Sequence, residues 1–476
     1  MADLTTAQTY DGGSSDRWHA VTAGYLGWTL DAFDFFVVIF LFDVLAQHFH
    51  VSKGAIILSV TGTLAMRPFG ALIFGMMADR YGRRRPLMAN VIFFSAIELL
   101  CGFAPNFTVF FILRLLFGIG MGGEWGVGAS LAMEHAPVKW RGVLSGILQS
   151  GYSCGYLLAA VAARVVLPNL GWRAMFWVGG LPALLALYIR TKVPESEAWR
   201  QHKVARVIDG PKIAMQHKRL VLYMVALMFL MNCLSHGTQD LYPDFLKHGY
   251  GIAPNTVAYI TIFYNIGALT GAVLFGLLSE RIGRRYGMLA ALTLSLLIMP
   301  VWAFGGTVMV LTLAAFVMQM GVQGAWGVIP VHLNELSPNA VRGLLPGFTY
   351  QIGILLAAST PTIEFALRDR LGYPWALTSF ELIVIAGLAL LLLFGRENKG
   401  KSFLLHPSDC DCFEENCMER ETGIEPATNS LGSCDSTTEL LPLSPADMPS
   451  VTLPQNRPQS TGVLTWAMGS AALNNN

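Results

Sequence analysis

The stretch GMMADRYGRR, residues 75–84, returns in altered form as GLLSERIGRR at residues 276–285. The two copies are 201 residues apart (280 − 79). A second pair of phrases, GEWGVGASLAMEHAPVKWRG at 123–142 and GAWGVIPVHLNELSPNAVRG at 324–343, has the same offset (324 − 123). Two unrelated motifs that share one long offset predict a duplicated unit of about two hundred residues, which suits two homologous half-domains better than a solenoid.

The composition predicts that both halves lie in a membrane. Hydrophobic residues make up 53% of the chain and charged residues only 13%, about half the share of a typical soluble domain. Apolar stretches of roughly 20 residues, long enough to cross a bilayer, follow one another along both halves. We expect twelve spans, near residues 20–47, 54–77, 87–104, 108–132, 143–165, 174–190, 220–246, 256–279, 287–304, 307–331, 343–363 and 375–395.

Lys and Arg residues in the connections give the expected orientation. They gather after spans two, four and eight and in the segment between the halves, whereas the opposite connections carry few. By the positive-inside rule, both termini and the central segment are expected in the cytoplasm. The predicted fold is an all-α membrane protein with 12 transmembrane helices in two pseudo-symmetric six-helix bundles. Its expected parts are a cytoplasmic N-terminus (1–18), the first bundle (19–190), a cytoplasmic linker (191–219), the second bundle (220–403) and a disordered tail (404–476).

The repeated motifs point to a family. G-x-x-x-D-R-x-G-R-R after span two, and E-x-x-P-x-x-x-R-G after spans four and ten, resemble the signatures of the major facilitator superfamily. The resemblance covers about residues 15–403. It implies a transporter whose two six-helix bundles enclose a central cavity and work by alternating access. The sequence contains no Walker loop, H-E-x-x-H or G-x-S-x-G motif, so we expect neither an enzyme nor a nucleotide-driven pump.

The repeated charges are expected to form a cytoplasmic gate. Asp79 with Arg83, and Glu134 with Arg141, place opposite charges at cytoplasmic helix ends, where such pairs can hold the inner side closed and release it. Gly75 and its counterpart in the second half lack a Cβ, which allows neighbouring helices to approach closely. The alternative is that these charges only determine topology. The predicted gate residues are Gly75, Asp79, Arg83, Glu134, Arg141, Glu280, Arg284, Glu335 and Arg342.

Polar residues that break the repeat are better candidates for substrate chemistry. Four pairs at the common offset show the break: Asp31 with Asn232, Asp34 with Ser235, Arg114 with Ala315, and Glu124 with Ala325. An ionisable side chain inside a span costs several kcal/mol unless it faces water or a partner, so these positions are functional hypotheses. In span seven, Asn232, His236 and Asp240 recur every four residues, which puts them on one helical face and indicates a cavity wall.

The span-seven phrase narrows the resemblance. N-x-x-S-H-x-T-Q-D, residues 232–240, resembles the signature of the lactate/pyruvate:proton symporters in the sialate and carboxylate branch, although Asp244 stands where that signature has Thr or Ser. LGWTLDAFDFF, RLLFGIGMGGEWG and YQIG are similar to the same branch. The resemblance implies a carrier in the inner or plasma membrane that moves a small monocarboxylate with a proton. The alternatives are a sialic acid or sugar-acid:proton symporter and a transporter-like nutrient sensor.

Chemistry suggests a role for each candidate. A guanidinium binds a carboxylate through two hydrogen bonds, and Arg114 is taken as the one arginine well inside a span; a structural ion pair is its alternative role. His236 and Asp240, one turn apart, are expected to share a proton or to form a rigid hydrogen-bond network. The predicted substrate-binding residues are Arg114, Asn232, His236, Gln239 and Gln351, and the predicted proton-coupling residues are Asp31, Asp34, Glu124, His236 and Asp240.

The expected partners are a small anionic carboxylate, protons and the lipid bilayer. We expect no nucleic acid, no cofactor and a monomeric protein. Cys410, Cys412, Cys417 and Cys434 lie in the tail at a spacing that matches no standard zinc pattern, so we expect no metal site there.

Overall fold

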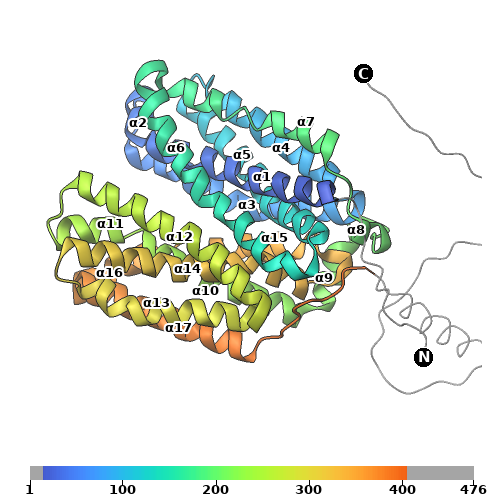
Figure 1. Cartoon of the computed structure of the whole chain (residues 1–476). Helices are drawn as coiled ribbons and strands as arrows, with labels where there is room; N and C mark the ends of the chain where they lie inside the picture. The colour runs from blue at the N-terminus through green and yellow to red at the C-terminus, as the bar shows by residue number, and fades with distance from the viewer. Residues whose placement is uncertain (1–13, 405–476) are drawn as a thin grey trace, which may run out of the picture. The chain divides into compact units, whose positions relative to one another are not determined.

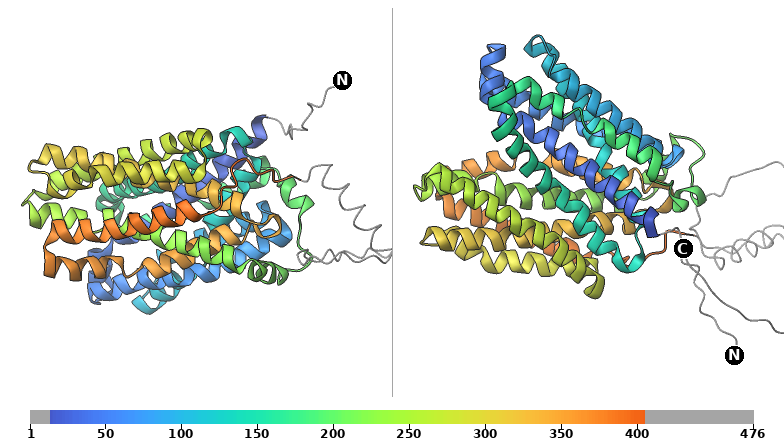
Figure 2. Two further views of the ribbon diagram at one scale, coloured as in Figure 1. Left: turned by 90° about the horizontal axis from the view of Figure 1, so that it is seen from below. Right: turned by 45° about the horizontal axis from the view of Figure 1, so that its top comes forward.

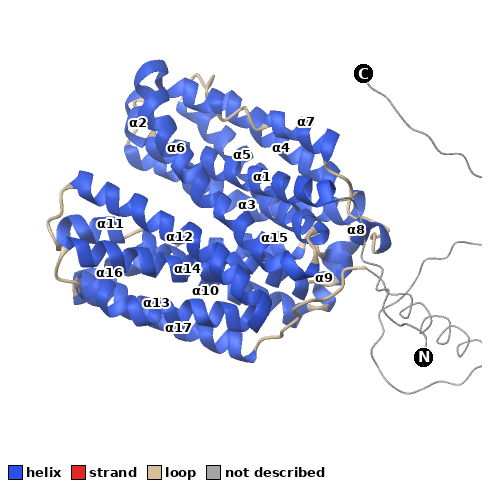
Figure 3. Cartoon of the chain, in the orientation of Figure 1, coloured by secondary structure: helices blue, strands red, loops and turns tan. Residues whose placement is uncertain are grey.

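The computed structural model describes residues 14–404, which form helices joined by short connections, with no strand in this range (Figure 3). The expected all-α membrane fold is confirmed. Nine stretches of the described chain are long and apolar enough to span a bilayer, by length and composition. The first 13 residues, and the tail cysteines Cys410, Cys412, Cys417 and Cys434, lie outside the described range.

The first half of the chain forms one helical bundle, drawn in blue to green in Figure 1. The predicted first span, 20–47, is two helices that meet at Leu41. The break in α6 at Gly171, where φ is 78°, lies between predicted spans five (143–165) and six (174–190). The helices are α1 (Ser14–Phe40), α2 (Phe42–Phe49), α3 (Lys53–Tyr81), α4 (Arg84–Cys101), α5 (Phe107–His135), α6 (Arg141–Val178) and α7 (Ala183–Lys192), with a 3₁₀ turn at Val138–Trp140.

The second half forms a similar bundle, in green to orange. Predicted span eleven, 343–363, is divided where α15 ends at Ala357 and α16 begins at Thr360. The helices are α10 (Lys218–Gln239), α11 (Tyr242–Asp244), α12 (Pro254–Ile282), α13 (Arg284–Phe304), α14 (Val308–Leu336), α15 (Leu345–Ala357), α16 (Thr360–Leu371) and α17 (Tyr373–Phe394), with a π-helical turn at Phe245–Gly249 and a 3₁₀ turn at Asn339–Val341.

Helix ends repeat at the same offset as the motifs. Asn106 Oδ1 accepts a hydrogen bond from Val109 N (3.0 Å) at the start of α5, and Thr307 Oγ1 accepts one from Val310 N (3.3 Å) at the start of α14. Such side-chain caps satisfy backbone N–H groups that a helix start leaves unpaired. After α3 and α12 the chain turns at a glycine whose φ is near +100°, in a conformation that favours glycine. Local sequence therefore fixes equivalent boundaries in both halves.

The two bundles contact each other at the end of the molecule where α8 (Glu197–Gln201) and α9 (Asp209–Gln216) lie, as Figures 1 and 2 show. A Cβ added to Gly75 would lie 2.8 Å from Leu344 Cα, and one added to Gly276 would lie 2.4 Å from the carbonyl oxygen of Gly142. Both glycines therefore allow close approach between the halves, which is the role predicted for them.

Candidate functional site

A cavity of about 100 Å³ lies between the halves. Asn232 and His236 of α10, together with Asp240 directly after its end, contribute to the cavity wall, as the four-residue periodicity predicted. His236 Nδ1 lies 3.0 Å from Asp240 Oδ2, and the two side chains remain 35% and 40% exposed. The wall consists of Trp28, Phe36, Gln149, Tyr152, Asn232, Ser235, His236, Gln239, Asp240, Gln323, Trp326, Tyr350 and Ile354.

Aromatic rings form much of the cavity wall. Tyr350 lies among them, with ring centroids 4.7 Å from Trp125, 5.7 Å from Trp326 and 6.3 Å from Trp28. Trp28 also stacks on Tyr152 at 5.5 Å. The indole N–H groups of Trp28 and Trp326 have no hydrogen-bond partner, although both are buried. The wall thus combines apolar ring surface with unused hydrogen-bond donors.

Amide side chains add further polar groups. Gln239 Nε2 donates to Gln319 Oε1 at 2.8 Å, which links α10 to α14 beside the cavity. Asn232 Nδ2 donates to the carbonyl oxygen of Met228 at 2.7 Å, inside its own helix. Gln351, in contrast, does not line the cavity: it is fully buried, and its Nε2 donates to the carbonyl oxygen of Gly122 at 3.4 Å. The structure therefore does not place Gln351, a predicted substrate-binding residue, in the cavity wall.

Arg67 of α3 lies behind the cavity wall. Its guanidinium carbon is 5.7 Å from the centre of the Tyr350 ring, and the residue is only 2% exposed. Asp31 and Glu124 both interact electrostatically with Arg67, and all four of their carboxylate oxygens lack a hydrogen-bond partner. The Nε and one terminal nitrogen of Arg67 are also unpartnered. We call Asp31, Arg67 and Glu124 the Arg67 cluster.

The sequence reasoning missed Arg67, although it lies within predicted span two. The claim that Arg114 was the one arginine well inside a span was therefore wrong. The signal was present, because the common offset aligns Arg67 with Ala268, so this position breaks the repeat as Arg114 does.

Arg114 lies elsewhere, inside the first bundle. Its guanidinium is ion-paired with Glu98 and hydrogen-bonded to Cys101 Sγ at 3.1 Å, and it lies 4.3 Å from the centre of the Phe117 ring. The side chain is 2% exposed and is not part of the cavity wall. The structure therefore corrects the prediction of a substrate contact and favours the alternative of a buried ion pair.

Asp34 belongs to the same region. A Cβ added to Gly179 would lie 2.5 Å from Asp34 Oδ1 and 2.6 Å from Glu98 Cγ, so the two acidic side chains approach each other there. Asp34 is fully buried, and both of its carboxylate oxygens are unpartnered. Asp34, Glu98, Cys101 and Arg114 form the Arg114 cluster. The two clusters adjoin, because Asp31 also interacts electrostatically with Glu98 and with Asp34.

At the other end of the helices, the repeated charges form two equivalent ion-pair networks. In the first half, Arg83 contacts Asp79 and Glu134, each at 2.9 Å. In the second half, Arg284 contacts Glu280 at 3.1 Å and Glu335 at 2.9 Å. These arginines are almost fully buried. Each network joins the end of one helix to the start of the next within its own half.

The same charges also connect the halves. Asp79 Oδ1 accepts a hydrogen bond from Gly343 N at 2.8 Å, and Glu280 Oε1 accepts one from Gly142 N. Two ion pairs cross as well: Arg342 with Glu134 at 3.3 Å, and Arg141 with Glu335 at 3.9 Å.

The predicted pairing of Glu134 with Arg141 is therefore wrong. Arg141 pairs with Glu335 of the second half, and Glu134 pairs with Arg342 of the second half. The contacts close the molecule on this side. All nine predicted gate residues lie in or beside this network.

The segment after α17 covers the network. Phe403 is 2% exposed and contacts two guanidinium groups. The centre of its ring lies 3.7 Å from the guanidinium carbon of Arg141 and 3.8 Å from that of Arg342. Lys401 Nζ donates to the carbonyl oxygen of Ser337 at 2.9 Å. Burial, together with the nearby Arg342 charge, lowers the pKa of Lys401 from 10.5 to about 8. The closed arrangement thus holds cations from both halves around one aromatic ring.

Comparison with known proteins agrees with this architecture. The Major Facilitator Superfamily model matches residues 25–239, and the Sugar (and other) transporter model matches residues 222–399. A solved structure of the proton:xylose symporter XylE has a TM-score of 0.66 and 20% identity and covers 82% of this chain and 98% of its own, which shows the shared fold.

Several curated relatives are similar over most of the chain. A probable 4-methylmuconolactone transporter of Cupriavidus pinatubonensis is 30% identical over 405 residues, covering 82% of this chain and 93% of the relative. The sialic acid transporter NanX of Escherichia coli is 27% identical and covers 81% and 95%. A carboxylic acid transporter protein homolog of Saccharomyces cerevisiae is 31% identical over 75% of this chain, which spans 62% of that relative's length.

The chain belongs to the major facilitator superfamily. It is a multi-pass membrane transporter and not an enzyme. The resemblance stated from the repeated motifs is confirmed, and the central cavity and closed gate are the parts of this fold through which its function must be explained.

Proposed function

We propose that the protein is a secondary active transporter that carries a small organic carboxylate together with a proton by alternating access, and that the structure represents its outward-facing state. The observation that carries the proposal is Arg67, a buried cation directly behind the cavity wall with two nitrogens that have no hydrogen-bond partner. Guanidinium nitrogens without hydrogen bonds are costly inside a membrane protein, and a carboxylate is the group that a guanidinium binds best.

Substrate recognition follows from the groups around Tyr350. A rotation of that ring would expose Arg67 to the cavity, where its two free N–H groups match the two oxygens of a carboxylate. The unpartnered indole N–H groups of Trp28 and Trp326 supply further donors. Asn232 and Gln239 are positioned for neutral hydrogen bonds to a hydroxyl or carbonyl group. In this proposal Arg67 takes the role that the sequence assigned to Arg114.

Proton coupling is proposed for two places. Asp31 and Glu124 interact with Arg67, and a proton on either carboxylate would neutralise it and leave Arg67 available to the substrate anion. His236 and Asp240 form an ion-pair geometry in the exposed cavity wall, where they can accept a proton from outside and pass it inward. Asp34 is not assigned a role in this proposal, because its carboxylate lies against Glu98 in the Arg114 cluster.

Charge balance favours this coupling. A monocarboxylate and one proton cross the membrane as a neutral pair, so the membrane potential does not oppose uptake. An anion entering alone would face about 2.3 kcal/mol per 100 mV of inside-negative potential. The closed gate beneath the cavity then prevents leakage until both ligands are bound, and its ion pairs must separate for release.

The names of the relatives support an organic acid as the substrate, but the acids that they name differ in size. They are named for carboxylic acid, sialic acid, niacin and cis,cis-muconate. A cavity of about 100 Å³ favours a small acid of the lactate or pyruvate type. The ring-rich wall favours a second candidate, a bulkier or cyclic acid, because aromatic faces pack well on flat ligands.

The test is a flux assay in proteoliposomes that contain a pH-sensitive dye. Lactate, pyruvate, nicotinate, cis,cis-muconate and sialic acid are added outside in turn, with protein-free liposomes as the control. We expect luminal acidification with at least one acid, lost in Arg67→Ala and strongly reduced in Asp240→Asn. Uptake without acidification would contradict proton coupling, and no uptake of any acid would contradict the assignment of cargo.

A further inference from the structure

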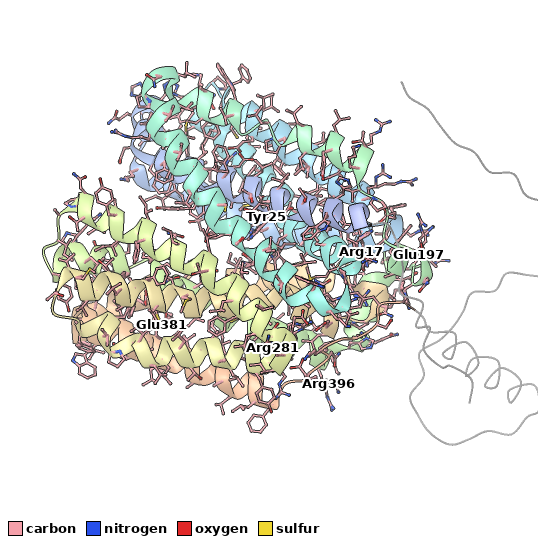
Figure 4. All side chains as sticks on the ribbon, in the orientation of Figure 1. Arg17, Tyr25, Glu197, Arg281, Glu381 and Arg396 are labelled. Atoms are coloured by element: carbon pink, nitrogen blue, oxygen red, sulfur yellow. The ribbon has the colours of Figure 1, made fainter. Side chains whose placement is uncertain are left out.

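A second and larger hollow lies outside the central cavity, at the gate end of the first bundle. It measures about 760 Å³ and lies where the start of α4, the end of α7 and the helix α8 meet. Figure 4 labels Glu197, which lies on α8 beside it. The residues that line it are Tyr81, Arg84, Arg85, Met88, Arg190, Glu195, Trp199, Arg200 and Lys203. We call it the basic pocket.

Cations dominate the lining of the basic pocket. Five of its side chains are Arg or Lys and one is acidic, and that acid, Glu195, already accepts hydrogen bonds from the backbone N–H groups of Arg83 and Arg84. Arg200 is paired with Glu197 at 3.0 Å. Arg85 and Arg190 are exposed, and their guanidinium groups contact no acidic side chain within residues 14–404. The pocket therefore presents uncompensated positive charge.

The repeat does not preserve this charge. At the common offset, Arg85 aligns with Tyr286 and Arg190 with Leu391. The two cations are therefore specific to the first half at these aligned positions. Charges that only determine topology are expected at equivalent helix ends of both halves, whereas Arg85 and Arg190 have no charged counterpart in the second half.

An apolar surface continues from the basic pocket along the bundle. Leu184 and Leu187 of α7 are 66% and 60% exposed, and Ile92 of α4 is 51% exposed. Leu187 lies one helical turn before Arg190, and Ile92 one turn after Met88. A ligand with an anionic head and apolar chains matches a cationic pocket that opens onto such a surface.

We propose that the basic pocket binds the phosphate headgroup of an anionic phospholipid of the cytoplasmic leaflet. Guanidinium groups bind phosphate oxygens in pairs, and Arg85 and Arg190 are free to do so. The tyrosine and tryptophan in the lining suit the boundary between headgroups and hydrocarbon. The lipid chains would then lie along Leu184, Leu187 and Ile92. A free phosphate ion offers the same headgroup chemistry without the chains.

Native mass spectrometry of the full-length protein in detergent, titrated with phosphatidylglycerol, tests the proposal. Each cation near a lipid surface contributes enough to change affinity about fivefold, so Arg85→Gln with Arg190→Gln should weaken binding about 25-fold. The matched control is Arg206→Gln with Arg281→Gln, which removes two exposed cations outside the pocket and should change little. Both double variants alter exposed residues and are expected to fold.

Two further titrations identify the source of the phosphate group. Phosphatidylcholine should bind weakly and equally to all three proteins, and inorganic phosphate at millimolar concentration should not displace phosphatidylglycerol from the wild type. Equal weakening in both double variants would overturn the proposal, because it would indicate attraction to general surface charge. Displacement by inorganic phosphate would overturn the lipid assignment and leave a small-anion site.

Discussion

The gate and the interior of this transporter differ in whether charged residues of one half have charged counterparts in the other. At the gate, Asp79, Arg83 and Glu134 have counterparts with the same charge in the second half, and both sets form equivalent ion pairs. In the interior, Arg67 aligns with Ala268 and Glu124 with Ala325. At the gate both members of each aligned pair are charged, whereas near the cavity a charged residue of either half aligns with an uncharged one, as Asp240 does with Ile39.

This difference follows from what each region has to do. A gate that joins two similar bundles is built most simply from one motif used twice, since each copy reaches a carboxylate or backbone N–H of the other half. A substrate anion needs one cation at one place. A second arginine at position 268 would add a buried charge without a partner, which costs several kcal/mol in a membrane.

The largest expected effect separates the two interior arginines. Replacing Arg114 by Ala leaves the Glu98 carboxylate buried without its partner, so we expect the free energy of unfolding to fall by about 3–5 kcal/mol. The double variant Arg114→Leu with Glu98→Leu removes both charges and should recover most of that loss. Thermal unfolding in detergent measures both. Full stability of the single variant would show that the Arg114 cluster does not stabilise the fold.

Arg67 is expected to show the opposite pattern. Arg67→Ala copies the residue of the second half and should reduce the initial rate of substrate uptake about 100-fold, because it removes the charged hydrogen bonds to the carboxylate. Its unfolding temperature should change less than that of Arg114→Ala. Arg67→Lys keeps the positive charge but cannot form two parallel hydrogen bonds to a carboxylate, so its uptake rate should lie between those of the wild type and Arg67→Ala. Uptake at the wild-type rate in Arg67→Ala would remove the proposed anchor.

The gate offers a matched pair of smaller changes. Asp79→Asn and Glu280→Gln each weaken one hydrogen bond from the opposite half and one ion pair within their own half. We expect each to stabilise the open gate by about 2 kcal/mol relative to the closed one. Hydrogen–deuterium exchange should rise by similar factors in the connection 337–344 of Asp79→Asn and in the equivalent connection 136–143 of Glu280→Gln. A large difference between the two variants would mean that the two networks are not equivalent.

The smallest effect concerns pH. The pKa of Lys401 is lowered to about 8 in the folded protein from an ordinary 10.5, so between these pH values the folded protein binds fewer protons than the unfolded chain. The free energy of unfolding should therefore increase as the pH rises from about 8 toward 10.5. Scanning fluorimetry of thermal unfolding should show this rise in the wild type and a flatter profile in Lys401→Gln. Identical profiles would exclude Lys401 as its source.

Much of this architecture could be predicted from the sequence because it depends on local patterns. The offset of 201 residues and the apolar runs predicted two helical bundles, and the four-residue spacing of Asn232, His236 and Asp240 predicted one cavity wall. The break at Gly171 falls between predicted spans five and six, but the breaks at Leu41 and after Ala357 lie inside predicted spans and could not be recognised, because the apolar character continues across them. Hydropathy reports burial in lipid and carries little information on where a helix bends.

The errors in the candidate site have a common physical origin. Arg141 and Arg342 each reach a carboxylate of the other half, and such exchange depends on how the two bundles dock. Arg114 could not be excluded from the cavity without knowing that Glu98 of a neighbouring helix reaches it. Arg67 is different, because its mismatch with Ala268 was visible in the sequence and a full search for broken symmetry would have found it.

The most direct test compares one interior and one gate residue by a single measurement, the affinity for the acid identified in the flux assay. Isothermal titration with Arg67→Ala and Arg83→Gln distinguishes the two regions. We predict that Arg67→Ala loses binding, whereas Arg83→Gln binds within a few-fold of the wild type because its network closes the gate and does not contact the substrate. Retained binding in Arg67→Ala, together with lost binding in Arg83→Gln, would contradict the division between a duplicated gate and a one-sided cargo site.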